Sequence, residues 1–282
     1  MKELVRLYRD QLFEIAGNEN YIISDNSISS RTDQWFKTYI WDKRRFRNLD
    51  VSALENQELF AKVFNDFILL DNVFVTPKVV LEFKYFRKLI RDKIVFMDEN
   101  EKQREVYNES RQSLLNEKVK RGKESIEDLY LILSKIYRNL KQSLFIPSLE
   151  PTYKNLEERA LGVAKKPGVK INYTLLRYGN YKKDEDLHTD EEIAASAFYN
   201  SLVNHSSTSI ITSDSDIMKI VRNMARKFSR METFGGFEIE SLMNHPVKVY
   251  FFNGERFRLR FDSSYSFHLL LNDKNQFLDE VV

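Results

Sequence analysis

The sequence of 282 residues contains no cysteine. This absence excludes disulfide bonds, thiolate zinc sites, iron–sulfur clusters and cysteine nucleophiles, and it fits a reducing compartment. No apolar run reaches the ~18 residues that a membrane-spanning helix needs. The first residues form a charged amphipathic pattern without the uncharged apolar core of a signal peptide. We therefore expect a cytoplasmic protein with no membrane segment.

The net charge is small, because the sequence has 44 Lys and Arg residues and 42 Asp and Glu residues. The basic residues are nevertheless unevenly distributed along the chain. The stretch 165–183 is basic and has no acidic residue, and a second basic group follows Asp216. Basic clusters around a small acidic centre suit a polyanion held next to cations, although such clusters can also simply keep helix faces soluble. The candidate nucleic-acid-binding residues are Lys165, Lys166, Lys170, Arg177, Lys219, Arg222 and Arg226.

Alternating element types predict an α/β fold with a mostly parallel sheet. Short apolar runs predict strands at 21–23, 72–75, 209–212 and 247–252, and the Asn253-Gly254 turn predicts a C-terminal hairpin with 256–261. Periodic apolar residues predict the helices, which we place at 2–16, 53–66, 77–92, 190–203 and 216–230.

A helical insertion is expected to interrupt this α/β pattern. Charged, leucine-containing sequence predicts a hairpin of two helices, 99–120 and 124–144, separated at Gly122, and a strand is expected at 169–176. The resulting organisation is a first part of the α/β domain at 1–96, the insertion with a basic linker at 97–178, the second part at 179–252, and a β extension at 253–282.

Acidic residues stand at or near the carboxyl ends of the predicted strands, where open parallel sheets carry their functional groups. Asp25 follows the first strand, Asp214 and Asp216 follow the strand at 209–212, and Asp190 opens the helix before it. Each has a structural alternative. Asp25 could be a turn residue, Asp190 could lie in a capping box formed by Thr189 and Glu192, and Asp214 or Asp216 could cap a helix.

Glu82 is harder to explain as a structural residue. Helical spacing from Val79 places it between Leu89 and Phe86, within the apolar face of the helix at 77–92. A charge on a core-facing stripe costs several kcal/mol unless it is paired or binds a metal, which favours a functional role. The four histidines show no i,i+4 spacing, which argues against a histidine-based zinc site.

The acidic residues lie in four segments that together resemble the signature regions of PIN-domain nucleases. The third and fourth are the most specific: an Asp three residues before Ile-Ala-Ala-Ser-Ala, and an apolar strand that ends in Thr-Ser-Asp-Ser-Asp. The resemblance covers roughly residues 20–95 and 180–252. In order, the segments are Tyr21-Ile-Ile-Ser-Asp-Asn-Ser-Ile28, Thr76-Pro-Lys-Val-Val-Leu-Glu82, Thr189-Asp-Glu-Glu-Ile-Ala-Ala-Ser-Ala197 and Ile210-Ile-Thr-Ser-Asp-Ser-Asp-Ile217.

The resemblance implies a three-layer α/β/α sandwich whose acids bind Mg²⁺ or Mn²⁺ and hydrolyse phosphodiesters of RNA or, in some relatives, DNA. The residues that correspond to metal-binding acids are Asp25, Glu82, Asp190 and Asp214, with Asp216 as an additional acid and Ser27 or Thr212 as a supporting hydroxyl. Because the gap between Asp25 and Glu82 is longer than in compact family members, Asp33 and Asp42 are alternatives to Asp25.

The expected function is therefore metal-dependent endonucleolytic cleavage, with single-stranded or loop RNA as the expected substrate. Helices at 99–144 would clamp the substrate or a protein partner. The alternatives are a catalytically silent nucleic-acid-binding or scaffold module, the toxin nuclease of a toxin–antitoxin pair, or a ribonuclease H-like sheet that carries the same acids.

Overall fold

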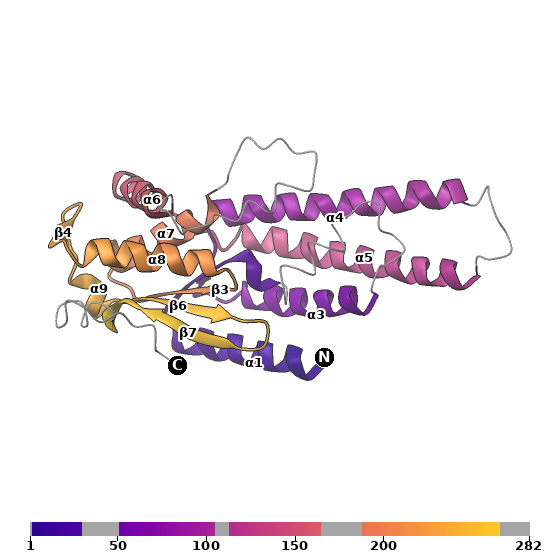
Figure 1. Ribbon diagram of the computed structural model, residues 1–282, viewed down its shortest axis with the longest axis horizontal. Helices are drawn as coiled ribbons and strands as arrows, with labels where there is room; N and C mark the ends of the chain where they lie inside the picture. The colour runs from indigo at the N-terminus through magenta and orange to yellow at the C-terminus, as the bar shows by residue number, and fades with distance from the viewer. Residues whose placement is uncertain (1, 30–50, 105–112, 165–187, 266–282) are drawn as a thin grey trace.

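A five-stranded mixed sheet forms the centre of the protein in the computed structural model, which describes residues 2–29, 51–104, 113–164 and 188–265 (Figure 1). The strand order is β2-β1-β3-β6-β7. Neighbouring strands are parallel except β7, which is antiparallel to β6. The strands are β1 (Tyr21–Ser24), β2 (Val73–Phe74), β3 (Thr208–Thr212), β6 (Val247–Phe252) and β7 (Phe257–Asp262).

Helices flank the sheet, as the alternation of elements predicts. On one side lies α1 (Lys2–Asn18), and on the other lie α7 (Thr189–Val203) and α8 (Ser215–Phe228) (Figure 1). α3 (Val51–Phe67) packs against α1 and extends beyond the ends of the strands. The expected α/β fold with a mostly parallel sheet and a C-terminal antiparallel pair is therefore confirmed.

Aromatic side chains fill the space between the sheet and both sets of helices. On the α1 side, the Tyr8 ring centroid is 4.8 Å from that of Phe60 in α3 and 5.1 Å from that of Phe252 in β6. On the opposite side, the centroids of Phe198 in α7 and Phe228 in α8 are 5.1 Å apart. Burying such large apolar side chains contributes about 1.5–3 kcal/mol each, so this packing fixes the helices that carry the acidic residues.

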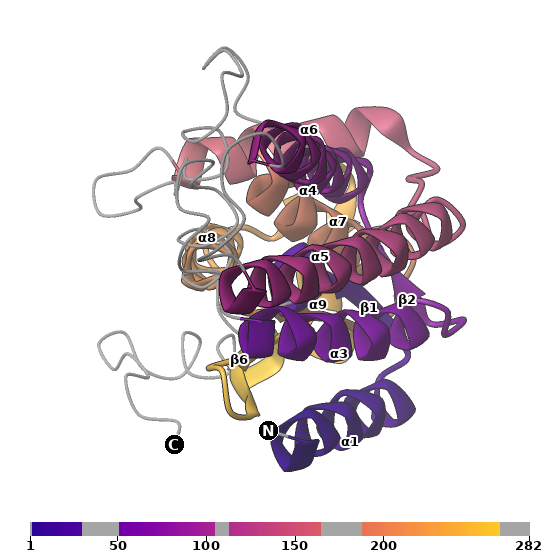
Figure 2. The ribbon, with the colours of Figure 1, turned by 90° about the vertical axis from the view of Figure 1, so that its right-hand side faces the viewer.

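The long helices α4 (Pro77–Arg104) and α5 (Ser113–Leu140) extend beyond the sheet and lie side by side over α3 (Figures 1 and 2). The start of α4 at Pro77 agrees with the prediction. The expected division at Gly122 is wrong, because α5 passes through it without a break. A glycine costs a helix only about 1 kcal/mol, and α5 offsets that cost through buried residues at helical spacing, which include Ile126, Leu129 and Leu133.

The proposed boundary at residue 96/97 falls inside α4, which continues twelve residues past the end predicted at 92, to Arg104.

The helix α6 (Glu150–Ala164) was not predicted, because Pro151 looks like a helix breaker in the sequence. Proline is well tolerated in the first turn of a helix, where its missing N–H has no helical partner, and Pro151 occupies that turn. The helix packs on α7 and α8.

Three short elements complete the described fold. β4 (Thr233–Phe234) and β5 (Phe237–Glu238) form a small hairpin, and α9 (Ser241–Asn244) precedes β6. Gly235 and Gly236 close the hairpin with φ values of 59° and 87°, which residues with a side chain rarely adopt. None of the described helices is long and apolar enough to cross a membrane. The strand expected at 169–176 lies outside the described residues.

Candidate functional site

Asp25 directly follows β1 and is 5% exposed. Its Oδ2 atom accepts hydrogen bonds from the hydroxyl groups of Ser27 and Thr212, the latter at 2.9 Å. The backbone N–H of Ser213 donates to Ser27 Oγ at 2.8 Å, which ties this turn to the end of β3. Burial raises the pKa of Asp25, while the hydrogen bonds from Ser27 and Thr212 act to lower it. The two predicted supporting hydroxyls thus both bind the carboxylate that they were expected to support.

Asp190 lies in the first turn of α7. The predicted capping box between Thr189 and Glu192 is wrong, because α7 starts after His188 (φ 51°) and no side chain caps it. The Glu192 carboxylate instead accepts a hydrogen bond from the backbone N–H of Lys78 at 2.8 Å, at the start of α4. The N–H of Lys78 is in the first turn of α4 and has no acceptor within its own helix, so it is available to bind the Glu192 carboxylate. Glu192 therefore joins the start of α7 to the start of α4.

Asp214 is the N-cap of α8, and its Oδ1 atom accepts a hydrogen bond from the backbone N–H of Asp216 at 2.8 Å. The capping role considered for Asp214 is therefore real. The backbone N–H of Asp214 in turn donates to Thr212 Oγ1 at 2.8 Å, which connects this residue to the hydroxyl that binds Asp25. Asp216 is buried and its Oδ1 atom lies 2.5 Å from Lys219 Nζ.

Glu82 lies in α4 and is partly buried, as its place on the apolar face predicts. The side-chain amide of Asn26 donates to Glu82 Oε2 at 3.3 Å and to the backbone carbonyl of Val79 at 2.8 Å. Asn26 follows Asp25 directly, so this amide links the acid on α4 to the end of β1. The role of Asn26 was not predicted, although it stands inside the first segment of the resemblance.

Asp190 is the point at which the acidic residues converge. Its pKa is raised well above the usual value, first by burial and then by the negative charges of Asp214, Asp25, Glu82 and Glu191. Asp25, Glu82 and Asp214 thus all lie close enough to Asp190 to disfavour its ionised form, although Asp25 and Glu82 precede Asp190 by more than one hundred positions of sequence. Glu191 was not predicted as part of this group. Asp216 is not among the acids that raise the pKa of Asp190, and Asp33 and Asp42 lie outside the described residues.

The donor set of this acidic cluster suits a hard divalent cation, which prefers carboxylate and carbonyl oxygens. A further oxygen, Asn26 Oδ1, is buried there without a hydrogen-bond partner. Within the described ranges, however, no three Asp, Glu or His side chains form a ready set of metal ligands. Carboxylates would therefore have to turn toward an ion or reach it through water, as proteins commonly do with Mg²⁺.

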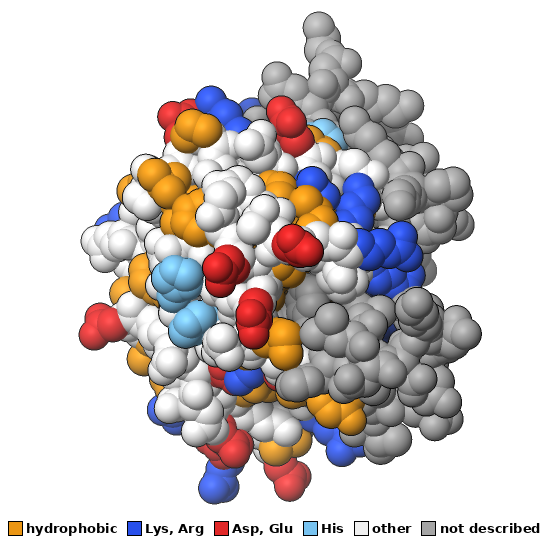
Figure 3. Space-filling view, turned by 90° about the vertical axis from the view of Figure 1, so that its left-hand side faces the viewer, with side chains coloured by type: hydrophobic (Ala, Val, Ile, Leu, Met, Phe, Trp, Pro, Cys, Tyr) orange, Lys and Arg blue, Asp and Glu red, His pale blue; other side chains and the backbone are white. Residues whose placement is uncertain are grey.

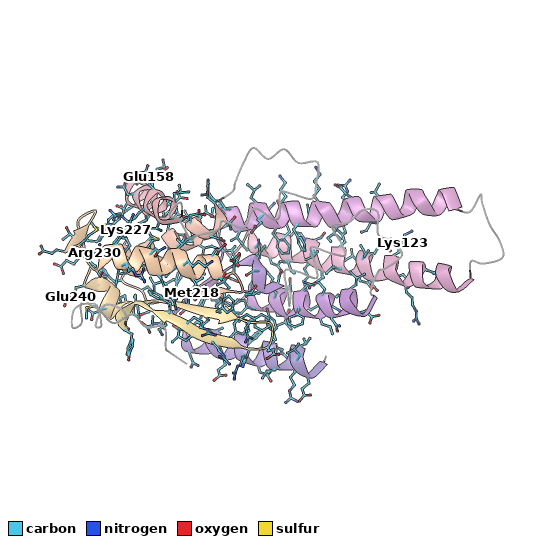
Figure 4. The ribbon with its side chains drawn as sticks, in the orientation of Figure 1. Lys123, Glu158, Met218, Lys227, Arg230 and Glu240 are labelled. Carbon is cyan, nitrogen blue, oxygen red and sulfur yellow. The ribbon has the colours of Figure 1, made fainter. Side chains whose placement is uncertain are left out.

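The predicted basic residues fall into two groups. Lys219, Arg222 and Arg226 lie at spacings of three and four on α8, so they share one face of the helix. Figure 4 shows Met218 near the start of α8 and Lys227 and Arg230 near its far end. The basic face therefore begins beside the acidic cluster and leads away from it. The other predicted residues, Lys165, Lys166, Lys170 and Arg177, lie outside the described residues.

Two histidines lie far from this cluster. His205 and His245 precede β3 and β6, so they lie at the amino ends of parallel strands whose carboxyl ends carry the acids. Their ring centroids are 5.6 Å apart. Figure 3 shows two neighbouring histidine side chains (pale blue) on the surface of the molecule. A third described histidine, His188, lies beside the cluster: it precedes Asp190 by two residues, and its Nδ1 atom is 3.5 Å from Glu191 Oε1.

No protein-family model matches the chain, and neither a curated protein nor a solved structure shows a significant match to it. The functional interpretation therefore depends on the geometry of the acidic cluster and on the sequence motifs that carry it.

Proposed function

We propose that the protein is a PIN-like, metal-dependent endonuclease that hydrolyses phosphodiester bonds, with single-stranded or loop RNA as its expected substrate. The observation that supports this proposal most strongly is the convergence of Asp25, Glu82 and Asp214 on Asp190. Several carboxylates gathered in one place are unfavourable for folding, because at an effective dielectric constant of 20 two of them ~5 Å apart repel by about 3 kcal/mol. A bound cation would remove this cost.

Each acid has a separate part in the proposed site. Asp25, Asp190 and Asp214 would hold Mg²⁺ or Mn²⁺ directly or through water, and Glu82 would orient a water or accept its proton. Such an ion supplies activation of water and neutralisation of charge on the phosphate. Ser27 and Thr212 hold the Asp25 carboxylate through the hydrogen bonds described above. No side-chain nucleophile is required.

The arrangement of helices is compatible with the three-layer α/β/α sandwich of the PIN family. The sheet lies between α1 on one side and α7 and α8 on the other (Figure 1). In this proposal Lys219, Arg222 and Arg226 bind phosphates, which positions a strand without reading its sequence. The projecting helices α4 and α5 would clamp the substrate or a protein partner.

Cleavage of an end-labelled single-stranded RNA in the presence of Mn²⁺ tests the proposal. Wild-type protein should cut the RNA internally, chelation of the metal should stop the reaction, and Asp190→Asn and Asp214→Asn should lower the rate at least a hundredfold. Asp10→Asn is a matched control, since Asp10 is exposed on α1 and pairs only with Arg6 at 3.6 Å in the described structure. Equal loss of activity in Asp10→Asn, or full activity in Asp190→Asn, would contradict the proposal.

The second candidate is a catalytically silent module that binds nucleic acid. It is favoured by one observation, namely that the described acids do not form a ready set of metal ligands. Binding of the same RNA without cleavage in either Mg²⁺ or Mn²⁺ would support this candidate over the nuclease.

A further inference from the structure

The C-terminal hairpin places an arginine in register with the acidic cluster. Thr212 of β3, which donates to Asp25, is paired with Phe251 of β6, and Phe251 is paired with Arg258 of β7. Adjacent strands are about 4.8 Å apart, so the Arg258 backbone lies roughly 10 Å from that of Thr212 along one row of the sheet. The row lies at the carboxyl ends of β3 and β6.

The side chain of Arg258 is on the same face of the sheet as α7 and α8. Phe252 contacts Tyr8 of α1, so it points toward the α1 side. Successive residues in a strand alternate between faces, and directly paired residues share a face. Phe251 and its partner Arg258 therefore point to the opposite side, where the helices that carry Asp190 and Asp214 lie.

The basic face of α8 continues onto this hairpin. The Arg222 guanidinium donates to the backbone carbonyl of Arg260 at 3.4 Å, which joins the two elements. Arg260 is exposed and sits at the irregularity of β7, because Val249 pairs with Phe261 while Tyr250 pairs with Leu259. The extra residue of such a bulge redirects its side chain away from the regular alternation. Lys219 and Arg222 of α8 and Arg258 and Arg260 of β7 thus lie on two neighbouring elements.

Hydrogen bonds at its turn and buried aromatic side chains fix the conformation of the hairpin. Asn253 Oδ1 accepts hydrogen bonds from the backbone N–H groups of Glu255 and Arg256, both at 3.0 Å, and Gly254 has a φ of 94°. Phe257 and Phe261 are buried. The acidic residues of the hairpin lie toward its ends, Glu255 at the turn and Asp262, whose Oδ1 accepts from Ser264 Oγ at 2.6 Å.

We infer that Arg258 and Arg260 of β7 bind backbone phosphates of a single-stranded polynucleotide, so that α8 and β7 together form a phosphate-binding track that leads to the acidic cluster. The inference rests on the proposed function and adds a substrate-binding surface outside the four segments of the resemblance. Charge complementarity identifies the occupant, since guanidinium groups pair with phosphate oxygens in a fixed geometry. Neither base identity nor a sugar hydroxyl is read by such contacts.

Binding of a labelled single-stranded RNA and of DNA of the same sequence, with EDTA present to prevent cleavage, tests the inference. The affinity is measured over a series of salt concentrations for wild type, Arg258→Ala, Arg258→Ala/Arg260→Ala and Arg258→Lys. For single strands the slope of log affinity against log salt falls by about 0.7 for each lost phosphate contact. The double variant should therefore have a slope smaller by about 1.4, and the lysine variant should retain most of the wild-type slope. Arg6→Ala, on the opposite side of the sheet, should match wild type.

The results separate this inference from the proposed function. An unchanged slope in the double variant, with wild-type circular dichroism, would overturn the phosphate-binding track even if the protein cleaves RNA. A reduced slope in a protein that never cleaves RNA would support the track and favour the silent binding module. A slope lowered equally by Arg6→Ala would overturn the inference, as would displacement of the RNA by polyglutamate at equal charge concentration.

Discussion

Replacing Asp190 by asparagine should stabilise the protein when no divalent cation is present. Burial and the charges of Asp214, Asp25 and Glu82 raise the pKa of Asp190, which means that the folded state disfavours its ionised form. Asparagine has nearly the same shape and no charge, so the substitution removes the repulsion and keeps the packing. A substitution that inactivates the proposed enzyme should therefore make the fold more stable.

The expected size follows from Coulomb's law. One pair of carboxylates about 5 Å apart repels by roughly 3 kcal/mol at an effective dielectric constant of 20. Asp190 is partly exposed, so solvent screens part of this repulsion, and protonation of the carboxyl group removes a further part. We therefore expect Asp190→Asn to raise the free energy of unfolding by about 1–2 kcal/mol. For a chain of this length, such a gain raises Tm by roughly 2–8 °C.

The pH dependence of unfolding provides a second test of whether Asp190→Asn stabilises the protein. A carboxyl group with a raised folded-state pKa stabilises the fold below its unfolded pKa of about 3.9, and this stability is lost as pH rises through the folded pKa. In EDTA, Asp190→Asn and wild type should thus have similar stability in acid, and the variant should be the more stable near neutral pH. A metal at one hundred times its Kd should raise the free energy of unfolding of wild type by about 2.7 kcal/mol at neutral pH, and it should leave that of the variant unchanged.

Thermal unfolding followed by circular dichroism, with EDTA or with MnCl₂ across a pH series, measures all of these effects. Asp10→Asn again serves as the control for loss of one negative charge. If Asp190→Asn unfolds at a lower temperature than wild type in EDTA at neutral pH, the carboxylates do not repel one another as described, and the reasoning is refuted. An equal response of both proteins to Mn²⁺ would refute it as well.

Further substitutions test other parts of the structure. Thr212→Val removes the donor to Asp25 and the acceptor of the Asp214 N–H, and it should cost about 1–3 kcal/mol in urea unfolding; an unchanged midpoint would show that these bonds contribute nothing. Asp216→Asn should keep the rise in Tm with Mn²⁺, because that carboxylate is engaged by Lys219; loss of the response would instead make Asp216 a metal ligand. Gly17→Ala should stabilise α1 by up to about 1 kcal/mol, since the new Cβ meets nothing within 4 Å. Gly236→Ala should destabilise the protein by about 1–2 kcal/mol, because a residue with a side chain is strained at a φ of 87°. Thermal scans in which both substitutions shift Tm in the same direction would contradict this.

The parts of the fold that sequence predicted well have strong local signals. The strand at Tyr21–Ser24 and the strand at Thr208–Thr212 are short apolar runs bounded by turn residues, and Asn253-Gly254 closes the predicted hairpin. The acids at the ends of these strands could be grouped because parallel strands bring their carboxyl ends to one edge of the sheet.

The incorrect predictions share a physical cause, namely that tertiary contacts outweighed local preferences. Gly122 should end a helix, but α5 buries enough apolar surface on α3 and α4 to continue through it. Glu192 has the spacing of a capping residue for its own helix, yet its carboxylate binds the N–H of Lys78 in another helix. Neither contact is visible in a sequence, since α5 packs on α3 across more than forty residues and Glu192 reaches Lys78 across 114.

The positions of Asn26 and Arg258 relative to the acidic cluster could not be predicted, for a related reason. Asn26 reaches Glu82 across 56 positions of sequence, and Arg258 reaches the row of Thr212 only through the pairing of β3, β6 and β7. The Asn253-Gly254 turn predicts that hairpin, but the order of strands in the sheet decides which residues lie beside the acidic cluster.

Anomalous diffraction from crystals soaked in Mn²⁺ would show directly whether the acidic cluster binds a metal. We expect a peak of anomalous density between Asp25, Asp190 and Asp214 in the wild-type protein, and no peak at that position in Asp190→Asn crystals. A fully soaked wild-type crystal with no peak at these carboxylates, or with its strongest peak elsewhere on the protein, would show that these acids are not a metal site.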